Sequence, residues 1–209
     1  MMDLTQRQWV KHTVTHPFEG FSDLRWKKGG SLKIAFIIVF FFFLSGIASE
    51  RLYGFQFRMT DDRTFSIVPY LVKSIVLFAA WVVGNWSVCT LLDGEGTMKN
   101  ICIYSSYALI PFIAQRFINT ALSHILVQDE YVFMQAVSII GTGWSILLML
   151  SAVKAVHGYT VGKTLLAVLF TIAAMLIMLF LLVLFVSLIQ QVCIFVSSLC
   201  TEISYRVRV

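Results

Sequence analysis

The sequence predicts an all-α membrane protein, a polytopic bundle of five transmembrane helices. Its 209 residues are 58% hydrophobic and only 13% charged, about half the charged fraction that is usual for soluble domains. The apolar residues gather in five long stretches that hold no carboxylate: 33–49, 67–92, 100–124, 131–153 and 164–188. Each approaches or exceeds the ~20 residues that a helix needs to cross ~30 Å of hydrocarbon.

Helices rather than strands are predicted for these stretches. A run such as Ile34 to Leu44 is apolar on every side, whereas a membrane barrel strand alternates polar and apolar residues over ~10 residues. The predicted organisation is a cytoplasmic interfacial segment over 1–32, a five-span membrane domain over 33–188 and an outer amphipathic helical tail over 189–209.

The placement of Lys and Arg predicts the orientation. Basic residues are concentrated before or at the start of the first stretch: Arg7, Lys11, Arg25, Lys27, Lys28 and Lys33. Cytoplasmic segments of membrane proteins are enriched in Lys and Arg, so the amino terminus is predicted to be cytoplasmic. Five spans then place the carboxyl terminus outside. The net charge of +5 favours anionic lipid headgroups over nucleic acid, for which the sequence carries no motif.

The segment before the first span interleaves aromatic and basic residues. Phe18, Phe21 and Trp26 are predicted to lie in the headgroup boundary, with Lys27 and Lys28 against lipid phosphates. Two interpretations stay open. The segment is an anchor that fixes the first helix at the membrane surface, or it is a docking epitope for a cytoplasmic partner.

The two inner connections are predicted to be turns. Residues 93–96 read Asp-Gly-Glu-Gly, and the glycines allow positive φ. The alternative is that the paired carboxylates bind a cation or a basic surface of a partner, although two acids alone make an incomplete site for a divalent cation. Residues 157–164 end in Gly-Lys-Thr, like a phosphate-binding loop, but His157 stands where that motif needs its first glycine. A helix connection with Lys163 at the interface is therefore predicted.

Lys73 and Arg116 fall inside predicted spans, where a charge is costly. Both lie at a similar depth near the outer ends of their helices. One interpretation is that both side chains extend to the outer headgroups. The other is that they converge on an anion or on an acidic residue at the outer helix ends, namely Glu50, Asp129 or Glu130.

The fifth apolar stretch continues to Cys200, well beyond the length of one crossing. In this tail Val192, Phe195, Leu199 and Ile203 recur at helical spacing and predict an apolar stripe. The stripe is predicted to lie on the outer leaflet or to be held by a partner.

The sequence carries no recognisable catalytic or metal-binding arrangement. His12 and His16 form the one metal-like pair, with no third ligand near in sequence, and no span holds a nucleophile, a base and an orienting group. Pro111 predicts a kink in the third span, which alone does not make a transport site. A protein that is not an enzyme and needs no cofactor is predicted.

Several short motifs occur in order along nearly the entire chain. They are 16–21 (His-Pro-Phe-Glu-Gly-Phe), Trp86 ahead of 91–96, 107–111 (Tyr-Ala-Leu-Ile-Pro), and Trp144 ahead of 157–159 (His-Gly-Tyr) and Lys163. Together they resemble the bacterial branch of the Yip (Ypt-interacting protein) membrane family. The resemblance implies five transmembrane helices, a cytosolic amino terminus and no established catalytic residues. Eukaryotic members resemble trafficking factors that bind Rab-type GTPases, a system that bacteria lack.

The predicted function is therefore a non-catalytic integral membrane subunit or scaffold in the bacterial cytoplasmic membrane. It would assemble with another membrane protein complex, a transporter being one candidate. The alternative is a small permease or a lipid- or anion-binding membrane protein that uses the region of Lys73 and Arg116. The residues expected to contact lipid or the partner are Phe18, Phe21, Trp26, Lys27, Lys28, Lys73, Arg116, Val192, Phe195 and Leu199.

Overall fold

The computed structural model describes residues 5–27, 29–57 and 66–207, and every regular element within these ranges is a helix. Five helical stretches are long and apolar enough to cross a membrane, which confirms the predicted all-α fold class: Leu32–Arg51, Val68–Leu91, Met98–Leu122, Gln128–His157 and Val161–Arg206. Lys28, which was expected to contact lipid phosphates, lies outside the described residues.

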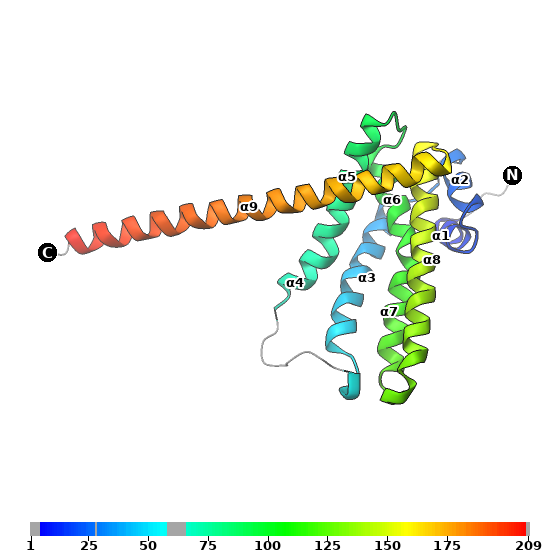
Figure 1. Cartoon of the computed structure of the whole chain (residues 1–209), viewed down its shortest axis with the longest axis horizontal. Coiled ribbons are helices and arrows are strands. Elements are labelled where there is room, and N and C mark those ends of the chain that lie inside the picture. Colours follow the sequence, from blue (N-terminus) through cyan, green and yellow to red (C-terminus); the bar gives the residue numbers. More distant parts are fainter. Residues whose placement is uncertain (1–4, 28, 58–65, 208–209) are drawn as a thin grey trace.

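Two short helices, α1 (Gln6–Thr15) and α2 (Glu19–Trp26), pack against each other at one end of the molecule. The first span is α3 (Leu32–Arg51), which lies beside the helices of the third span. Helix α8 (Tyr131–His157) packs along that third span on its other side. These helices form an upright bundle, with α1 and α2 beside its upper end in Figure 1.

The second and third spans are each interrupted. In the second, α4 (Val68–Leu71) passes through a π-helical turn, η2 (Val72–Val76), into α5 (Leu77–Leu91). The third span divides into α6 (Met98–Ala108) and α7 (Ile110–Leu122), with Pro111 in the first turn of α7. Proline has no N–H to donate to the carbonyl four residues earlier, that of Tyr107, and the Ser145 hydroxyl donates to the neighbouring Ala108 carbonyl at 2.6 Å. The helix of the third span is therefore interrupted at the place where the kink was predicted. Short 3-10 turns stand before the second and fourth spans, η1 (Phe55–Phe57) and η3 (Gln128–Glu130).

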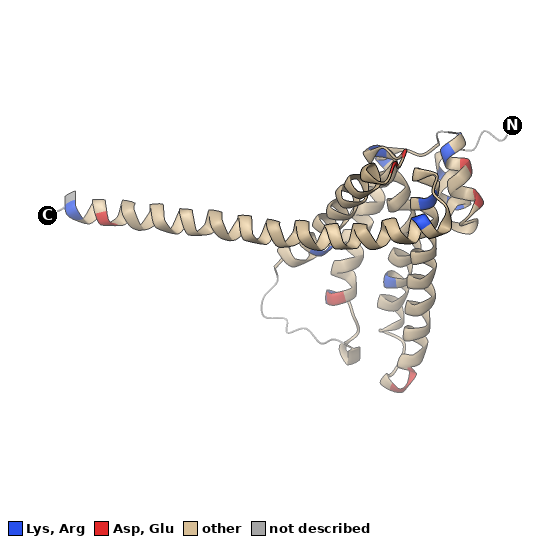
Figure 2. Ribbon diagram, turned by 45° about the horizontal axis from the view of Figure 1, so that its top comes forward, with Lys and Arg blue, Asp and Glu red and all other residues tan. Residues whose placement is uncertain are grey.

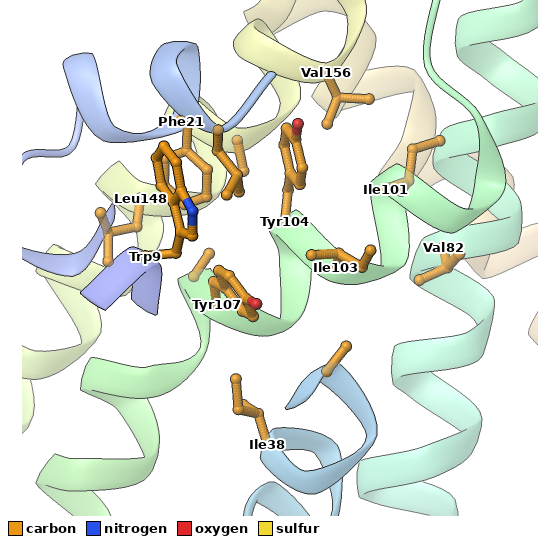
Figure 3. Close-up of a cluster of buried hydrophobic side chains, with 14 of the residues drawn as sticks. Trp9, Phe21, Ile38, Val82, Ile101, Ile103, Tyr104, Tyr107, Leu148 and Val156 are labelled. Carbon is orange, nitrogen blue, oxygen red and sulfur yellow. The ribbon is translucent and has the colours of Figure 1, made fainter. Parts of the chain in front are cut away.

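The core lies at the α1–α2 end and includes side chains from these two helices (Figure 3). Trp9, Phe21 and Leu24 are buried there, and the Phe21 ring lies 6.0 Å from that of Tyr104 on α6. The prediction that Phe21 lies in the headgroup boundary is therefore wrong. Phe21 and Leu24 are three residues apart on one face of α2, and that face is turned to the bundle. The segment before the first span is a helical cap that is part of the folded core.

Helix α9 (Val161–Val207) is 47 residues long, about 70 Å at 1.5 Å per residue. It contacts α5 and α8 near its start and then leaves the bundle. Figures 1 and 2 show it running across the upright helices and far beyond them. It carries no charged residue between Lys163 and Glu202. Helices α3, α7 and α8 run in another direction. If these three helices stand upright in a bilayer, α9 can cross the same bilayer only by changing its angle to them or by a tilt of the whole protein.

Candidate functional site

Polar side chains from three spans form one hydrogen-bonded chain near the α1–α2 end of the bundle. The His157 Nε2–H donates to Asn85 Oδ1 at 3.0 Å, while Nδ1 accepts the Gly96 N–H at 3.3 Å. The Asn85 amide then donates to Thr171 Oγ1 at 3.3 Å, and that hydroxyl donates to the Ala167 carbonyl at 2.7 Å. These partners fix His157 as the neutral Nε2–H tautomer. The chain joins the 92–97 loop to α8, α5 and α9.

Tyr159 closes this cluster from the loop between α8 and α9. Its ring stacks on His157 with centroids 5.3 Å apart. Its hydroxyl donates to the Cys89 and Leu92 carbonyls at 3.1 and 3.2 Å, which hold the end of α5. Burial raises the pKa of the Tyr159 hydroxyl well above its ordinary value, so the donor stays protonated. The ammonium of Lys163 lies over the same ring, 4.7 Å from its centroid.

The 93–96 turn has a different physical reason from the predicted one. Positive φ occurs at Asp93 (57°), not at either glycine of the turn. Gly94 is required by close approach: a Cβ there would lie 2.5 Å from His157 Nδ1 and 2.6 Å from the Tyr159 hydroxyl. A Cβ on Gly96 would collide with the same imidazole. The glycines therefore admit the His157 and Tyr159 side chains into the loop.

An ion pair joins the cap to the same loop. The Arg25 guanidinium on α2 contacts the Glu95 carboxylate and donates to the Ala155 carbonyl on α8 at 2.9 Å. Glu95 is largely exposed, and ion pairs of this kind contribute about 1 kcal/mol or less. The pair mainly fixes the position of α2, and a cleft of about 230 Å³ opens beside it between α2 and the end of α8.

Replacing Gly94 with alanine is expected to lower the free energy of unfolding by about 1 kcal/mol, because the new methyl group overpacks the His157–Tyr159 contact. The matched control is Gly162→Ala, since a Cβ at Gly162 meets no atom within 4 Å. Thermal unfolding of both variants in the same detergent measures the difference. Equal midpoints for the two variants would contradict the close packing of this loop.

Lys73 and Arg116 lie toward the opposite end of the bundle and have different partners. The Lys73 ammonium contacts the Glu50 carboxylate at 2.9 Å. The Arg116 guanidinium lies 4.5 Å from the ring centre of Phe112 and 5.7 Å from that of Phe42. Aromatic faces attract a guanidinium by cation–π interaction. Glu50 thus pairs with Lys73 and also interacts electrostatically with Arg116, while the Phe42 and Phe112 rings lie against the Arg116 guanidinium.

The remaining predicted contact residues lie on the surface. Phe18 is 67% exposed and Trp26 84% exposed, and the Lys27 ammonium lies 5.6 Å above the ring of buried Trp9. In the tail, the predicted stripe of α9 is exposed, as are the residues between its members: Val192, Ile194, Phe195, Val196, Leu199 and Ile203. The distal part of α9 is thus uncovered on all sides rather than on one.

The site offers no constellation typical of catalysis. Within the described ranges no three His, Cys, Asp or Glu side chains stand close enough to hold a metal ion. His12 pairs with Asp23 at 3.0 Å. The polar groups around His157 instead join four segments of the chain, so the arrangement is suited to holding helix ends together.

Sequence reasoning missed Asn85 and Thr171 as partners of His157. Both lie within apolar stretches, where a buried amide or hydroxyl needs a hydrogen-bonding partner. It also missed Asn119, whose amide donates to the Met134 carbonyl and to Ser138 at 3.1 and 2.6 Å. Isolated polar residues inside spans were the signal, but the sequence does not say which of them meet.

Fold and site together define a multi-pass helical membrane protein whose turn residues at 93–96 and 157–159 pack against one another. A family model for the Yip1 domain matches residues 11–191. The chain therefore belongs to the Yip1 domain family, in agreement with the resemblance noted in the sequence. Comparisons with curated proteins and with solved structures found no match.

Proposed function

We propose that the protein is a non-catalytic membrane subunit or scaffold of the bacterial branch of the family, placed in the bacterial cytoplasmic membrane. It assembles with another integral membrane protein complex, for example a transporter, and the distal part of α9 is the docking element. The α1–α2 end faces the cytoplasm, where Arg25, Lys99, Lys154 and Lys163 satisfy the positive-inside tendency.

The observation that carries this proposal is the exposure of α9. Every residue from Phe180 to Arg206 is exposed, and the first charge in that range is Glu202. An apolar helix of this length is unfavourable in water and needs lipid or protein around it. Membrane crossing uses about 20 residues, so a 47-residue helix has a surplus that a partner helix can pack against.

The setting of Lys73 and Arg116 favours this function over the permease or anion-binding alternative. An anion at Lys73 would have to compete with Glu50, which is already at 2.9 Å. An anion at Arg116 would have to draw the guanidinium away from the Phe42 and Phe112 rings. Neither cation is held ready for a ligand.

The hydrogen bonds of His157 support a structural role for this residue. Both ring nitrogens are satisfied, one by the Asn85 side chain and the other by the Gly96 N–H. A general acid or base needs a nitrogen within reach of a substrate proton. Here both nitrogens are occupied in joining α8 to α5 and to the 92–97 loop.

A photoreactive phenylalanine analogue placed at Phe195 tests the docking element in living cells. We expect one discrete protein adduct at Phe195, because this side chain lies on the uncovered part of α9. Phe40 on α3 is the matched control, since its ring is similarly exposed, 56% against 63%, but lies on the compact bundle. Lipid adducts alone at Phe195, or equal protein adducts at both positions, would contradict docking through α9.

A further inference from the structure

Two hollows adjoin at the end of α8 that faces the cap. The first is the cleft of about 230 Å³ beside α2. The second, of about 240 Å³, lies between α8 and the first turn of α9. Both are lined by Phe18, Ser151 and Lys154, so they are neighbouring parts of one surface depression.

The first hollow is positively charged. Arg25 and Lys154 line it, and no carboxylate is among the described residues that line either hollow. The Arg25 guanidinium also contacts Glu95, which lines neither hollow. Lys154 is exposed and has no ion pair among the described residues. The amino terminus of α9 adds to the field, because Val161 of its first turn lines the second hollow and a helix amino terminus is positive.

The second hollow is apolar. Apart from Ser151, Lys154 and Thr164, its walls are hydrocarbon and aromatic side chains: Phe18, Leu147, Leu150, Val161 and Leu165. Leu147 lies seven residues before Lys154 on α8, about 10 Å deeper along the helix. The apolar groove thus begins at the charged cleft and continues toward the middle of the bundle.

A charged cleft that passes into an apolar groove matches an amphiphile with an anionic head. We propose that this depression binds one anionic phospholipid from the leaflet that faces α1 and α2. Its phosphate lies at Lys154, between Arg25 and the start of α9, and an acyl chain follows Leu150 and Leu147. A phosphate gains charge-assisted hydrogen bonds from an ammonium, and the groove buries apolar surface of the chain.

This site differs from the docking element of the preceding section and from the Lys73 and Arg116 region. It lies on the opposite end of the bundle from these two cations, and it involves the start of α9 rather than its distal part. Its failure would leave the proposed assembly untouched, and loss of a protein partner would leave the lipid site untouched.

Native mass spectrometry of the purified full-length protein tests the proposal with phosphatidylglycerol and phosphatidylcholine. We expect retention of one phosphatidylglycerol and at least fivefold less phosphatidylcholine. Lys154→Gln should reduce phosphatidylglycerol retention at least fivefold, and Leu150→Trp, which fills the groove, should also reduce it. Lys99→Gln is the matched control, because Lys99 is an exposed lysine at the same end that lines neither hollow.

Three results would overturn the proposal. Equal retention of the two lipids would remove the role of the charge. Unchanged binding by Lys154→Gln, or equal losses in Lys154→Gln and Lys99→Gln, would remove the role of this lysine. Displacement of the lipid by an equal concentration of glycerol phosphate would show that the site recognises a water-soluble phosphate and that the groove contributes nothing. Because Lys154 is exposed and has no ion pair within the part of the chain that the structure describes, we expect its replacement to leave the fold intact.

Discussion

Replacing Asn85 with leucine is expected to lower the free energy of unfolding by about 2 to 3 kcal/mol. Asn85 is fully buried and stands in the middle of the chain of hydrogen bonds from Gly96 to the Ala167 carbonyl. Leucine would leave the His157 Nε2–H without an acceptor and the Thr171 hydroxyl without its donor. A buried polar group that loses its partner is costly because the surrounding side chains offer no replacement.

The same substitution should loosen α9, since the Asn85 amide donates a side-chain hydrogen bond from α5 to Thr171 on α9. Thermal unfolding in detergent measures the stability, and limited proteolysis near residue 171 measures the attachment of α9. Asn100→Leu is the matched control, because the Asn100 side chain is exposed at the start of α6. If both variants unfold at the same temperature, the buried chain contributes nothing to the fold.

Much of the fold could be predicted because a bilayer imposes few solutions. Apolar length alone predicted the five spans, and the break at Pro111 followed from its missing N–H. The direction of α9 could not be predicted. A helix that is apolar on every side has no face that tells where its neighbours lie, so the periodicity of residues 192–203 indicated a single stripe where the structure has uniform exposure.

The candidate site was predicted only in its parts. The 93–96 turn and the 157–159 motif were recognised separately. They follow the second and the fourth span, and the ends of these two spans lie on the same side of the membrane, so both were expected at one end of the bundle. The sequence could not show that Gly94 and Gly96 leave room for the His157 side chain. A turn that needs positive φ already explains a glycine, so nothing in the sequence pointed to close packing. Phe21 was misplaced for a related reason: an aromatic residue among basic residues is equally typical of an interface and of a buried cap.

Truncation after Gln191 tests most directly whether α9 is the docking element for a membrane partner. The shortened α9 keeps its contacts with α5 and α8 and remains longer than the ~20 residues needed for one crossing. Insertion and expression should therefore be unchanged. Recovery of the partner in mild detergent should fall about tenfold or more, which corresponds to a loss of about 1.4 kcal/mol in binding free energy.

A second variant keeps the full length of α9 and replaces Phe195 and Leu199 with serine. It should also reduce recovery of the partner, which would show that these side chains, and not the length of the helix, carry the docking. The measurement is the amount of the partner, relative to the protein itself, by quantitative mass spectrometry after affinity purification. We expect one integral membrane protein to be recovered in near-equal amount with the full-length chain and to be lost from the truncated chain. Equal recovery by both chains would contradict docking through α9, and recovery of a bound solute without any protein partner would favour the permease alternative.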